Sequence, residues 1–369
     1  MDLDLGPELR ELAAVARRYL VERVAADDAR RALDEAPWSR PDLLPELAAM
    51  GWLGIASPED VGGGGAGLAA AAVLAVEGGR ALLPGPFLPC LAAGIVIDRL
   101  GDDELRKRLL PDLFAGRRRV TPAVEEPRRG DGGGSPQTVA AGRPAGGGAV
   151  LDGLKILVPD AEGADVVVAA RTDHGPRWFL VEGNQPGVML EAMRRLDGQD
   201  VAEVRLDGVE VPAEHILGDR LGADFPADVW AVLLAADLLG VTECLLDMTR
   251  DHACTRVQFG RPIGSFQAVS HPLADIYVDV ELGRSLLYGA CLALDEGHSH
   301  AGPLVSAVKA WMNDAAVRAA ERALQLHGGI GFTWEHDVHL YLRRARANAA
   351  AGGGTGHHLD RIAAHLGLT

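Results

Sequence analysis

The sequence has little that would suit a secreted or nucleic-acid-binding protein. It holds only four cysteines in 369 residues, Cys90, Cys244, Cys254 and Cys291, and no two of them form a CxxC pair. They therefore indicate neither a disulfide framework nor a zinc knuckle. Lysine and arginine total 36 against 52 acidic residues, a net charge of −16. Nucleic acids and anionic membranes require a basic surface, so we expect no partner of either kind.

Long uninterrupted apolar runs are also missing. The longest ones contain charges or helix breakers, so we expect no segment that spans a membrane. The first residues, MDLDLGPELRELAA, begin acidic and lack the hydrophobic region of a signal peptide. These features predict a soluble cytoplasmic protein. With 48% hydrophobic residues, the chain is long enough for a large core in two or three domains.

Hydrophobic periodicity divides the chain into three segments. Residues 1–118 read as a helical domain, with Leu9, Leu12 and Ala16 at helical spacing. Further helices are predicted at 41–50, 66–81 and 102–115. The four glycines at 62–65 predict a flexible loop that allows a backbone or ligand to approach closely.

Residues 119–222 have the pattern of a β domain. An irregular loop is predicted over 128–148, where glycine and proline are frequent. Short β-type runs separated by turn residues follow at 149–151, 155–158, 166–170, 178–181, 188–190 and 201–206. Such spacing is typical of a small antiparallel barrel or sandwich.

Residues 223–369 return to helix and predict a four-helix bundle. Long helices are expected at 228–255, 267–296 and 303–326, the last ending at Gly328 and Gly329, and two shorter helices follow. The predicted fold is therefore α+β and multidomain, with a helical, a β and a helical domain in chain order.

Two segments carry a specific resemblance. The first reads RVQFGRPIG over 256–264 and continues with FQ at 266–267; the second reads QLHGGIGF over 325–332. Both resemble motifs of the acyl-CoA dehydrogenase family, and the resemblance covers nearly the whole chain. It implies the acyl-CoA dehydrogenase fold and an FAD cofactor. It also implies a dimer that shares FAD between its subunits. The two segments of one subunit hold the ADP half of an FAD whose other half is bound mainly by the neighbouring subunit.

The chemistry of these residues suits that role. Arg256 has a permanently charged guanidinium group that can donate two parallel hydrogen bonds to a pyrophosphate. Gln267 and Gln325 offer amides to a ribose or an adenine, and Gly328 and Gly329 let the backbone approach a flat or anionic group. The resemblance adds Gln258 and Phe259 to the predicted FAD-binding residues.

The catalytic base of the family is missing at its usual place. Members remove the α-proton of an acyl-CoA with a glutamate just before a Gly-Thr pair; here that position is Gly353, which cannot accept a proton. The alternative family position, on the first long helix, matches Trp230 and Ala231. We therefore predict no catalytic residue in this chain, with one weak candidate, Asp237, in an apolar run. Asp237 is either a displaced base or, by preference, a buried interhelical hydrogen-bonding group.

The β domain departs from the family pattern too. In the family, a Trp-x-Thr element lies against the flavin ring; here Leu157 replaces the Trp and Pro159 replaces the Thr. The family's glycine-rich loop is reduced to EEPRRG over 125–130. The elements for ring, thioester and base are therefore eroded, whereas those for the ADP half are intact.

This division predicts a subunit that completes the FAD site of a catalytic homologue, similar to the α2β2 acyl-CoA dehydrogenases of actinobacteria that act on steroid side chains. The assembly would carry out α,β-dehydrogenation of an acyl-CoA and pass electrons to an electron-transfer flavoprotein-like acceptor. Two alternatives remain open. One is a self-sufficient homo-oligomer with Asp237 as base, and the other is a non-enzymatic relative kept as a scaffold or thioester-binding module.

Two histidine pairs invite a metal interpretation and are assigned other roles. His357 and His358 are adjacent, so on a helix they diverge by about 100° and indicate a helix start on the surface. His336 and His339 are spaced i, i+3, a possible ligand pair. Their acidic neighbours Glu335 and Asp337 favour a solvated polar face instead.

Overall fold

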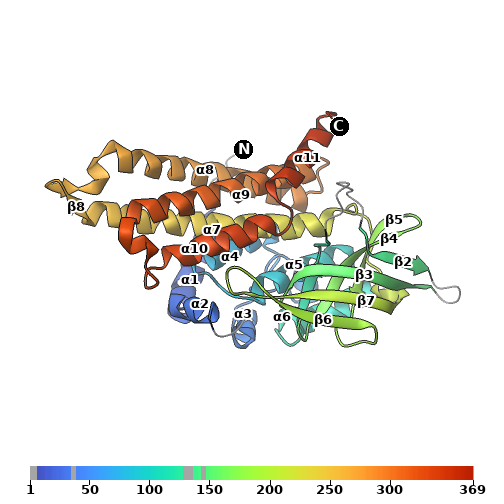
Figure 1. Ribbon diagram of the computed structural model, residues 1–369. Helices are drawn as coiled ribbons and strands as arrows, with labels where there is room; N and C mark the ends of the chain where they lie inside the picture. The colour runs from blue at the N-terminus through green and yellow to red at the C-terminus, as the bar shows by residue number, and fades with distance from the viewer. Residues whose placement is uncertain (1–5, 35–38, 128–135, 143–146, 369) are drawn as a thin grey trace. The chain divides into compact units, whose positions relative to one another are not determined.

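The computed structural model describes residues 6–34, 39–127, 136–142 and 147–368 (Figure 1). Contacts group the chain into two compact units. Unit 1 comprises residues 1–36, 68–83 and 231–369, and unit 2 comprises residues 37–67 and 84–230. The predicted division into 1–118, 119–222 and 223–369 follows chain order and stays a prediction, since contacts join 68–83 to the C-terminal helices.

Unit 1 is helical. Its helices are α1 (Pro7–Arg23), α2 (Ala26–Ala32), α4 (Gly67–Arg80), α7 (Phe225–Thr255), α8 (Gln267–Asp295), α9 (Ala301–His327), α10 (Val338–Ala350) and α11 (Thr355–His365), with the 3₁₀ turn η5 (Gly328–Phe332) after α9. The predicted C-terminal bundle is confirmed, including the two short helices at the end. In Figure 1 the long helices α7, α8 and α9 run side by side, and α9 packs against α8, α10 and α11.

Helix α7 contains a long apolar stretch that is mostly buried. It is long and apolar enough to cross a membrane by length and composition, but 83% of its most apolar stretch lies inside the molecule, as in the core helix of a soluble protein. Helices α4 and α7 meet backbone to backbone. A Cβ at Gly79 would lie 2.1 Å from the carbonyl oxygen of Asp237, and one at Gly240 would lie 1.9 Å from that of Val76, so only glycine permits this approach.

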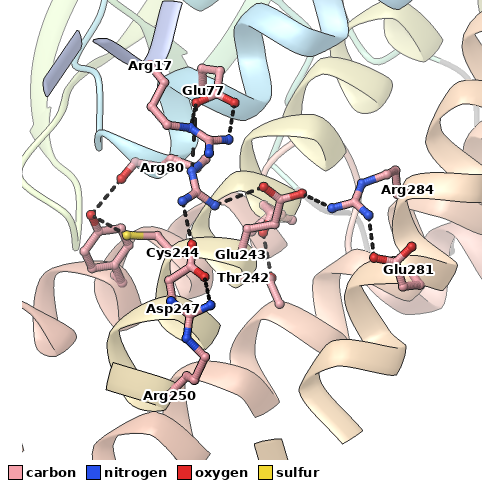
Figure 2. Close-up of polar contacts among 12 residues, drawn as sticks. Arg17, Glu77, Arg80, Thr242, Glu243, Cys244, Asp247, Arg250, Glu281 and Arg284 are labelled. Carbon is pink, nitrogen blue, oxygen red and sulfur yellow. Dashed lines mark hydrogen bonds and ion pairs between the residues drawn. The ribbon is translucent and has the colours of Figure 1, made fainter. Parts of the chain in front are cut away.

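A chain of alternating charges joins four helices of unit 1 (Figure 2). Arg17 of α1 donates to both carboxylate oxygens of Glu77 of α4, at 2.9 and 2.7 Å. Arg80 donates to Glu243 and Asp247 of α7, and Glu243 also accepts from Arg284 of α8 at 2.7 Å. Each buried carboxylate therefore has a guanidinium partner, which buried charges require.

Unit 2 contains one seven-stranded sheet. Its strands are β1 (Val120–Ala123), β2 (Val139–Gly142), β3 (Gly148–Pro159), β4 (Asp165–Thr172), β5 (Gly175–Val181), β6 (Val188–Arg194) and β7 (Asp200–Pro212). The order is β1-β4-β2-β3-β7-β6, with β5 paired to β4. The predicted β domain is confirmed, and its core is formed by small and branched apolar side chains such as Leu151, Val168 and Val204.

Three details of the strand prediction are corrected. The runs predicted at 149–151 and 155–158 are one strand, β3, whose pairing with β7 shifts register twice. Strand β2 lies inside the segment predicted as an irregular loop. Strand β1, which was not predicted, pairs in parallel with β4, so the sheet is mixed and not purely antiparallel.

The remaining helical elements of unit 2 are η1 (Pro41–Leu43), α3 (Leu44–Ala49), η2 (Glu59–Val61), α5 (Phe87–Leu100), α6 (Asp103–Phe114) and η3 (Ala213–His215). The glycine segment 62–65 forms a hydrogen-bonded turn and not the flexible loop that we expected. Gly63, Gly64 and Gly65 donate to backbone carbonyls of residues 54–58. A Cβ at Gly63 would lie 2.0 Å from the oxygen of Ser57, so the expected close backbone approach is present.

Candidate cofactor and catalytic site

One hairpin places most of the predicted FAD-binding residues. Arg256 follows α7, and the short strands β8 (Val257–Gln258) and β9 (Arg261–Pro262) pair directly after it. The turn between them puts Phe259 and Gly260 in the left-handed region, at φ 52° and 80°. The 3₁₀ turn η4 (Ile263–Ser265) then leads to Gln267, the first residue of α8.

The second predicted segment lies at the end of α9. Gln325 belongs to its last turn, and Gly328 and Gly329 open η5. Gly328 has φ 62° and ψ −141°, a conformation that is essentially restricted to glycine. A Cβ at Gly329 would meet no atom within 4 Å, so the backbone there is open to a ligand.

Stacked histidines connect these two segments. His252, one turn before Arg256, stacks on His327, the last residue of α9, with ring centroids 4.6 Å apart. His327 in turn meets His336 edge to face at 4.6 Å. The structure therefore brings the end of α7 and the end of α9 together, as the resemblance implies. The histidine contact was not predicted, because its members are far apart in the sequence.

The strip made by these segments, residues 256–267 and 325–332, is exposed. The side chain of Phe259 is 91% exposed, and those of Val257, Ile330 and Phe332 are more than half exposed. Arg256, Gln258, Gln267 and Gln325 are exposed as well. A guanidinium, three amides and an open glycine backbone fit the polar groups of a dinucleotide's ADP half. Apolar side chains gathered beside them are typical of a surface that contacts another chain.

A side chain at the position of the missing base would be strained and crowded. Gly353 has φ 93°, and a Cβ there would lie 2.6 Å from Cδ2 of His357 and 2.8 Å from Nε2 of His358. The prediction that both histidines are on the surface is wrong for His358, which is 1% exposed. Its Nε2 lies 2.9 Å from the carbonyl oxygen of Gly352. Burial lowers the pKa of His358 to about 3, so its imidazole is neutral.

Buried polar groups fix the backbone around Gly353. The carbonyl of Gly353 accepts a hydrogen bond from Nδ2 of Asn313 at 3.2 Å. The fully buried ammonium of Lys309 donates to Oδ1 of Asn313 and to the carbonyl oxygen of Asn348, the latter at 2.9 Å. The segment that would carry the base is therefore held from α9 and α10, with its volume taken by His358 and its neighbours.

Asp237 is occupied by two partners. Arg344 of α10 donates to both of its carboxylate oxygens, at 3.0 and 2.7 Å, and Nδ2 of Asn348 donates to Oδ1 at 2.6 Å. The carboxylate is 2% exposed. This geometry agrees with the preferred interpretation of Asp237 as a buried interhelical hydrogen-bonding group, since Arg344 and Asn348 of α10 together occupy both of its carboxylate oxygens.

In unit 2, the segments that depart from the family pattern make their own buried polar contacts. Lys155 of β3 is fully buried and donates to Glu126 at 2.6 Å, and Glu126 also accepts from Thr138. Burial alone would raise the pKa of Glu126, but Lys155 lowers it below the ordinary value. Leu157 sits in the register shift of β3 with φ 53°. Residues 128–130 of the predicted loop lie outside the described residues.

The histidine pair considered as metal ligands is engaged with backbone groups. Nδ1 of His336 accepts from the N–H of Val338 at 3.3 Å, and Nε2 of His339 lies 3.1 Å from the carbonyl oxygen of Trp334. Within the described residues, no group of three or more potential ligands is arranged to hold a metal ion.

Comparison with known proteins identifies the family. The pattern described as acyl-CoA dehydrogenase, N-terminal domain, matches residues 6–117, and that described as acyl-CoA dehydrogenase, C-terminal domain, matches residues 228–367. The acyl-CoA dehydrogenase IpdE2 of Mycobacterium tuberculosis is 34% identical over 93% of this chain and 92% of its own.

Solved structures agree. A variant of the Tcur3481-Tcur3483 steroid acyl-CoA dehydrogenase superposes with a TM-score of 0.91 at 34% identity, covering 99% of both chains. The ChsE4-ChsE5 complex from Mycobacterium tuberculosis gives a TM-score of 0.90 at 31% identity, covering 100% of both chains.

The fold and the strip thus define a flavoprotein oxidoreductase whose cofactor is FAD. The chain belongs to the acyl-CoA dehydrogenase family. Of the similar structures, one is described as the ChsE4-ChsE5 complex and another carries the double name Tcur3481-Tcur3483.

Proposed function

We propose that this chain is the non-catalytic subunit of a heteromeric, FAD-dependent acyl-CoA dehydrogenase. It lacks a base of its own and completes the FAD site of a homologous catalytic subunit in an α2β2 assembly. The reaction is the α,β-dehydrogenation of an acyl-CoA thioester, and electrons leave to an electron-transfer flavoprotein-like acceptor. We place the assembly in the cytoplasm.

The observation that carries this proposal is the state of position 353. Its backbone angle strains any residue but glycine, and the neighbouring His357 and His358 fill the volume that a side chain would need. A chain that used a carboxylate here would keep this volume open. The base position is therefore closed by backbone and packing together, while the ADP-binding strip keeps its donors on the surface.

Each group of this chain then has a defined task. Arg256 binds the pyrophosphate, and Gln258, Gln267 and Gln325 orient the ribose and adenine. The backbone of Gly328 and Gly329 lies against the ADP half, and Phe259 packs on the partner chain and excludes water. When bound, FAD supplies hydride-accepting chemistry. The carboxylate that removes the α-proton of the thioester belongs to the partner.

The alternative in which Asp237 acts as a displaced base in a homo-oligomer has less support. A general base needs a free lone pair and a path to the substrate proton, whereas Asp237 is buried and already accepts from Arg344 and Asn348. The similarity to named complexes of unlike chains also favours the heteromeric assembly.

The test is reconstitution with a homologous acyl-CoA dehydrogenase chain that has the glutamate missing here. We expect the chain alone to oxidise no acyl-CoA and the two chains together to bind flavin and turn over. Replacing Arg256 by Met in this chain should lower flavin content in the assembly, with Arg250→Met, on an exposed face of α7, as the matched control. Stoichiometric flavin and acyl-CoA oxidation by the chain alone would contradict the proposal.

A further inference from the structure

Three imidazoles lie in a row, called the histidine stack below, between the two segments that bind the ADP half in our proposal: His252 stacks on His327, and His336 meets His327 edge to face. His252 lies on α7, His327 ends α9, and His336 precedes α10. Neighbouring ring centroids are 4.6 Å apart. His327 is buried and its Nδ1 lies 2.8 Å from the carbonyl oxygen of Ala323. That contact makes Nδ1 the nitrogen that carries the hydrogen in the neutral ring.

The stack is coupled directly to the predicted pyrophosphate ligand. The N–H of Arg256 donates to the carbonyl oxygen of His252 at 2.9 Å, so the two residues lie one helical turn apart. On the other side, His327 immediately precedes Gly328. The stacked rings of His252 and His327 therefore join the two backbone segments that carry Arg256 and the glycine turn.

The charges around the stack are mostly positive. Arg256, directly after α7, carries a permanent positive charge, and His339 lies at the start of α10. The carboxylate of Asp337, beside the stack, is already paired with Arg30 of α2. Burial, the neighbouring histidines and Arg256 all lower the pKa of His252, and burial and His327 lower that of His336 despite Asp337. Protonating one ring would place it about 4.6 Å from another titratable ring, where like charges repel.

We propose that His252, His327 and His336 form a proton-linked clamp that holds Arg256 and the Gly328–Gly329 turn at a fixed separation and takes up protons when a pyrophosphate binds. The inference rests on the proposed function for its ligand. An anion beside Arg256 offsets the positive charge that opposes protonation of His252. Binding and proton uptake are therefore linked, and affinity increases as pH falls.

Without ligand, a fall in pH lowers the stability of the folded chain, whereas it increases the affinity for FAD. Above the ordinary histidine pKa of 6.5, the rings of His252 and His336 are neutral in both the folded and the unfolded chain. As pH falls below that value the unfolded chain takes up protons more readily than the stack does. Without ligand, the clamp is therefore weakest in acid, and stability is lost as pH falls from about 6.5 toward the lowered pKa values.

Calorimetric titration of the flavin-free assembly of this chain and its catalytic homologue with FAD at pH 6, in buffers of different ionisation enthalpy, measures the proton uptake. We expect a positive uptake and tighter binding at pH 6 than at pH 8, up to about tenfold for each histidine whose pKa rises by one unit. His252→Phe keeps an aromatic ring at this position but removes the group that binds a proton. This variant should therefore fold and bind FAD, with no proton taken up at position 252. His298→Gln is the matched control, because His298 stacks on His300 at 5.1 Å but has no part in the strip.

A second measurement needs no ligand. The unfolding midpoint of the wild-type chain should fall between pH 7 and pH 5, and His252→Phe should flatten this fall, whereas His298→Gln should leave it unchanged. Unchanged proton uptake and an unchanged pH profile in His252→Phe would overturn the clamp. If neither the chain nor its assembly binds FAD while the ligand-free profile behaves as expected, the proposed function fails and the clamp's pH response stands.

Discussion

Position 353 excludes a side chain in two independent ways. The backbone angle of 93° lies where L-residues are strained, and two imidazoles stand within 3 Å of the place where a Cβ would be. We expect Gly353→Glu to give no acyl-CoA oxidation by the chain alone, although it restores the family's residue. Its free energy of unfolding should fall by about 1–3 kcal/mol because of the strained conformation, which denaturant unfolding measures.

The control for this change is Gly356→Glu, three residues on. Gly356 is exposed in the first turn of α11, and a Cβ there meets no atom within 4 Å. An acidic residue near a helix N-terminus is favourable, so this variant should be as stable as the wild type. Turnover gained by Gly353→Glu alone would show that position 353 remains a usable base site.

Asp237 offers a second test at the scale of a single residue. Replacing it by Asn leaves the buried guanidinium of Arg344 without its counter-charge, so we expect a loss of about 3–5 kcal/mol in the free energy of unfolding. Turnover per folded assembly should be unchanged, because the carboxylate has a structural role. Asp360→Asn, on the exposed side of α11, should stay within about 0.5 kcal/mol of the wild type. A folded, flavin-containing assembly of Asp237→Asn without turnover would support the displaced base instead.

The role of a residue could be predicted from the sequence where that residue conflicts with the pattern of its neighbours. A carboxylate in an apolar run has to be paired if it is buried, so Asp237 could be interpreted from its neighbours alone. Lys155, Lys309 and His358 gave no such signal. Their burial depends on partners distant in the chain, such as Glu126 for Lys155 and Ser306 for His358.

The hairpin after α7 ends in a side chain with little packing inside its own chain, an edge-to-face contact with Phe266 at 6.0 Å. Phe259 at its tip is 91% exposed, so Phe259→Ser should leave the stability of the isolated chain within about 0.5 kcal/mol of the wild type. We expect it to weaken association with the catalytic homologue by at least about tenfold, in the range of an aromatic interface anchor. Sedimentation or light scattering of the mixed chains measures this.

Val21→Ser provides the comparison for the hairpin. Val21 lies on α1 and is 74% exposed, but it is outside the strip. Equal association of both variants with the partner would mean that the hairpin tip contacts nothing in the assembly.

Elements with strong periodicity could be predicted and short ones could not. Helices α6, α8 and α9 agree with the predicted ranges to within two residues at each end, because caps and glycines mark their ends. Strands β1 and β2 have four residues each, too few for an alternating pattern to show. Their pairing with β4 and β3 comes from the sheet, which one sequence does not display.

For the assembled molecule, the retained and lost elements predict a flavin count. If each FAD needs the ADP strip of one chain and the ring and base elements of the other, one flavin is bound for each pair of unlike chains. We therefore expect two flavins in an α2β2 tetramer, measured by flavin absorbance against protein mass. Four flavins in the tetramer would show that this chain also provides a complete ring site.

The geometry at Gly353 also bears on how such a division of labour persists in evolution. Regaining a glutamate there would require a new backbone angle, a displaced His358 and a repositioned Asn313 contact, all before any catalytic benefit appears. No single substitution offers an improved intermediate. If the chain works as the non-catalytic subunit that we propose, restoring the glutamate alone would not make it independent, and selection would act on the two subunits together.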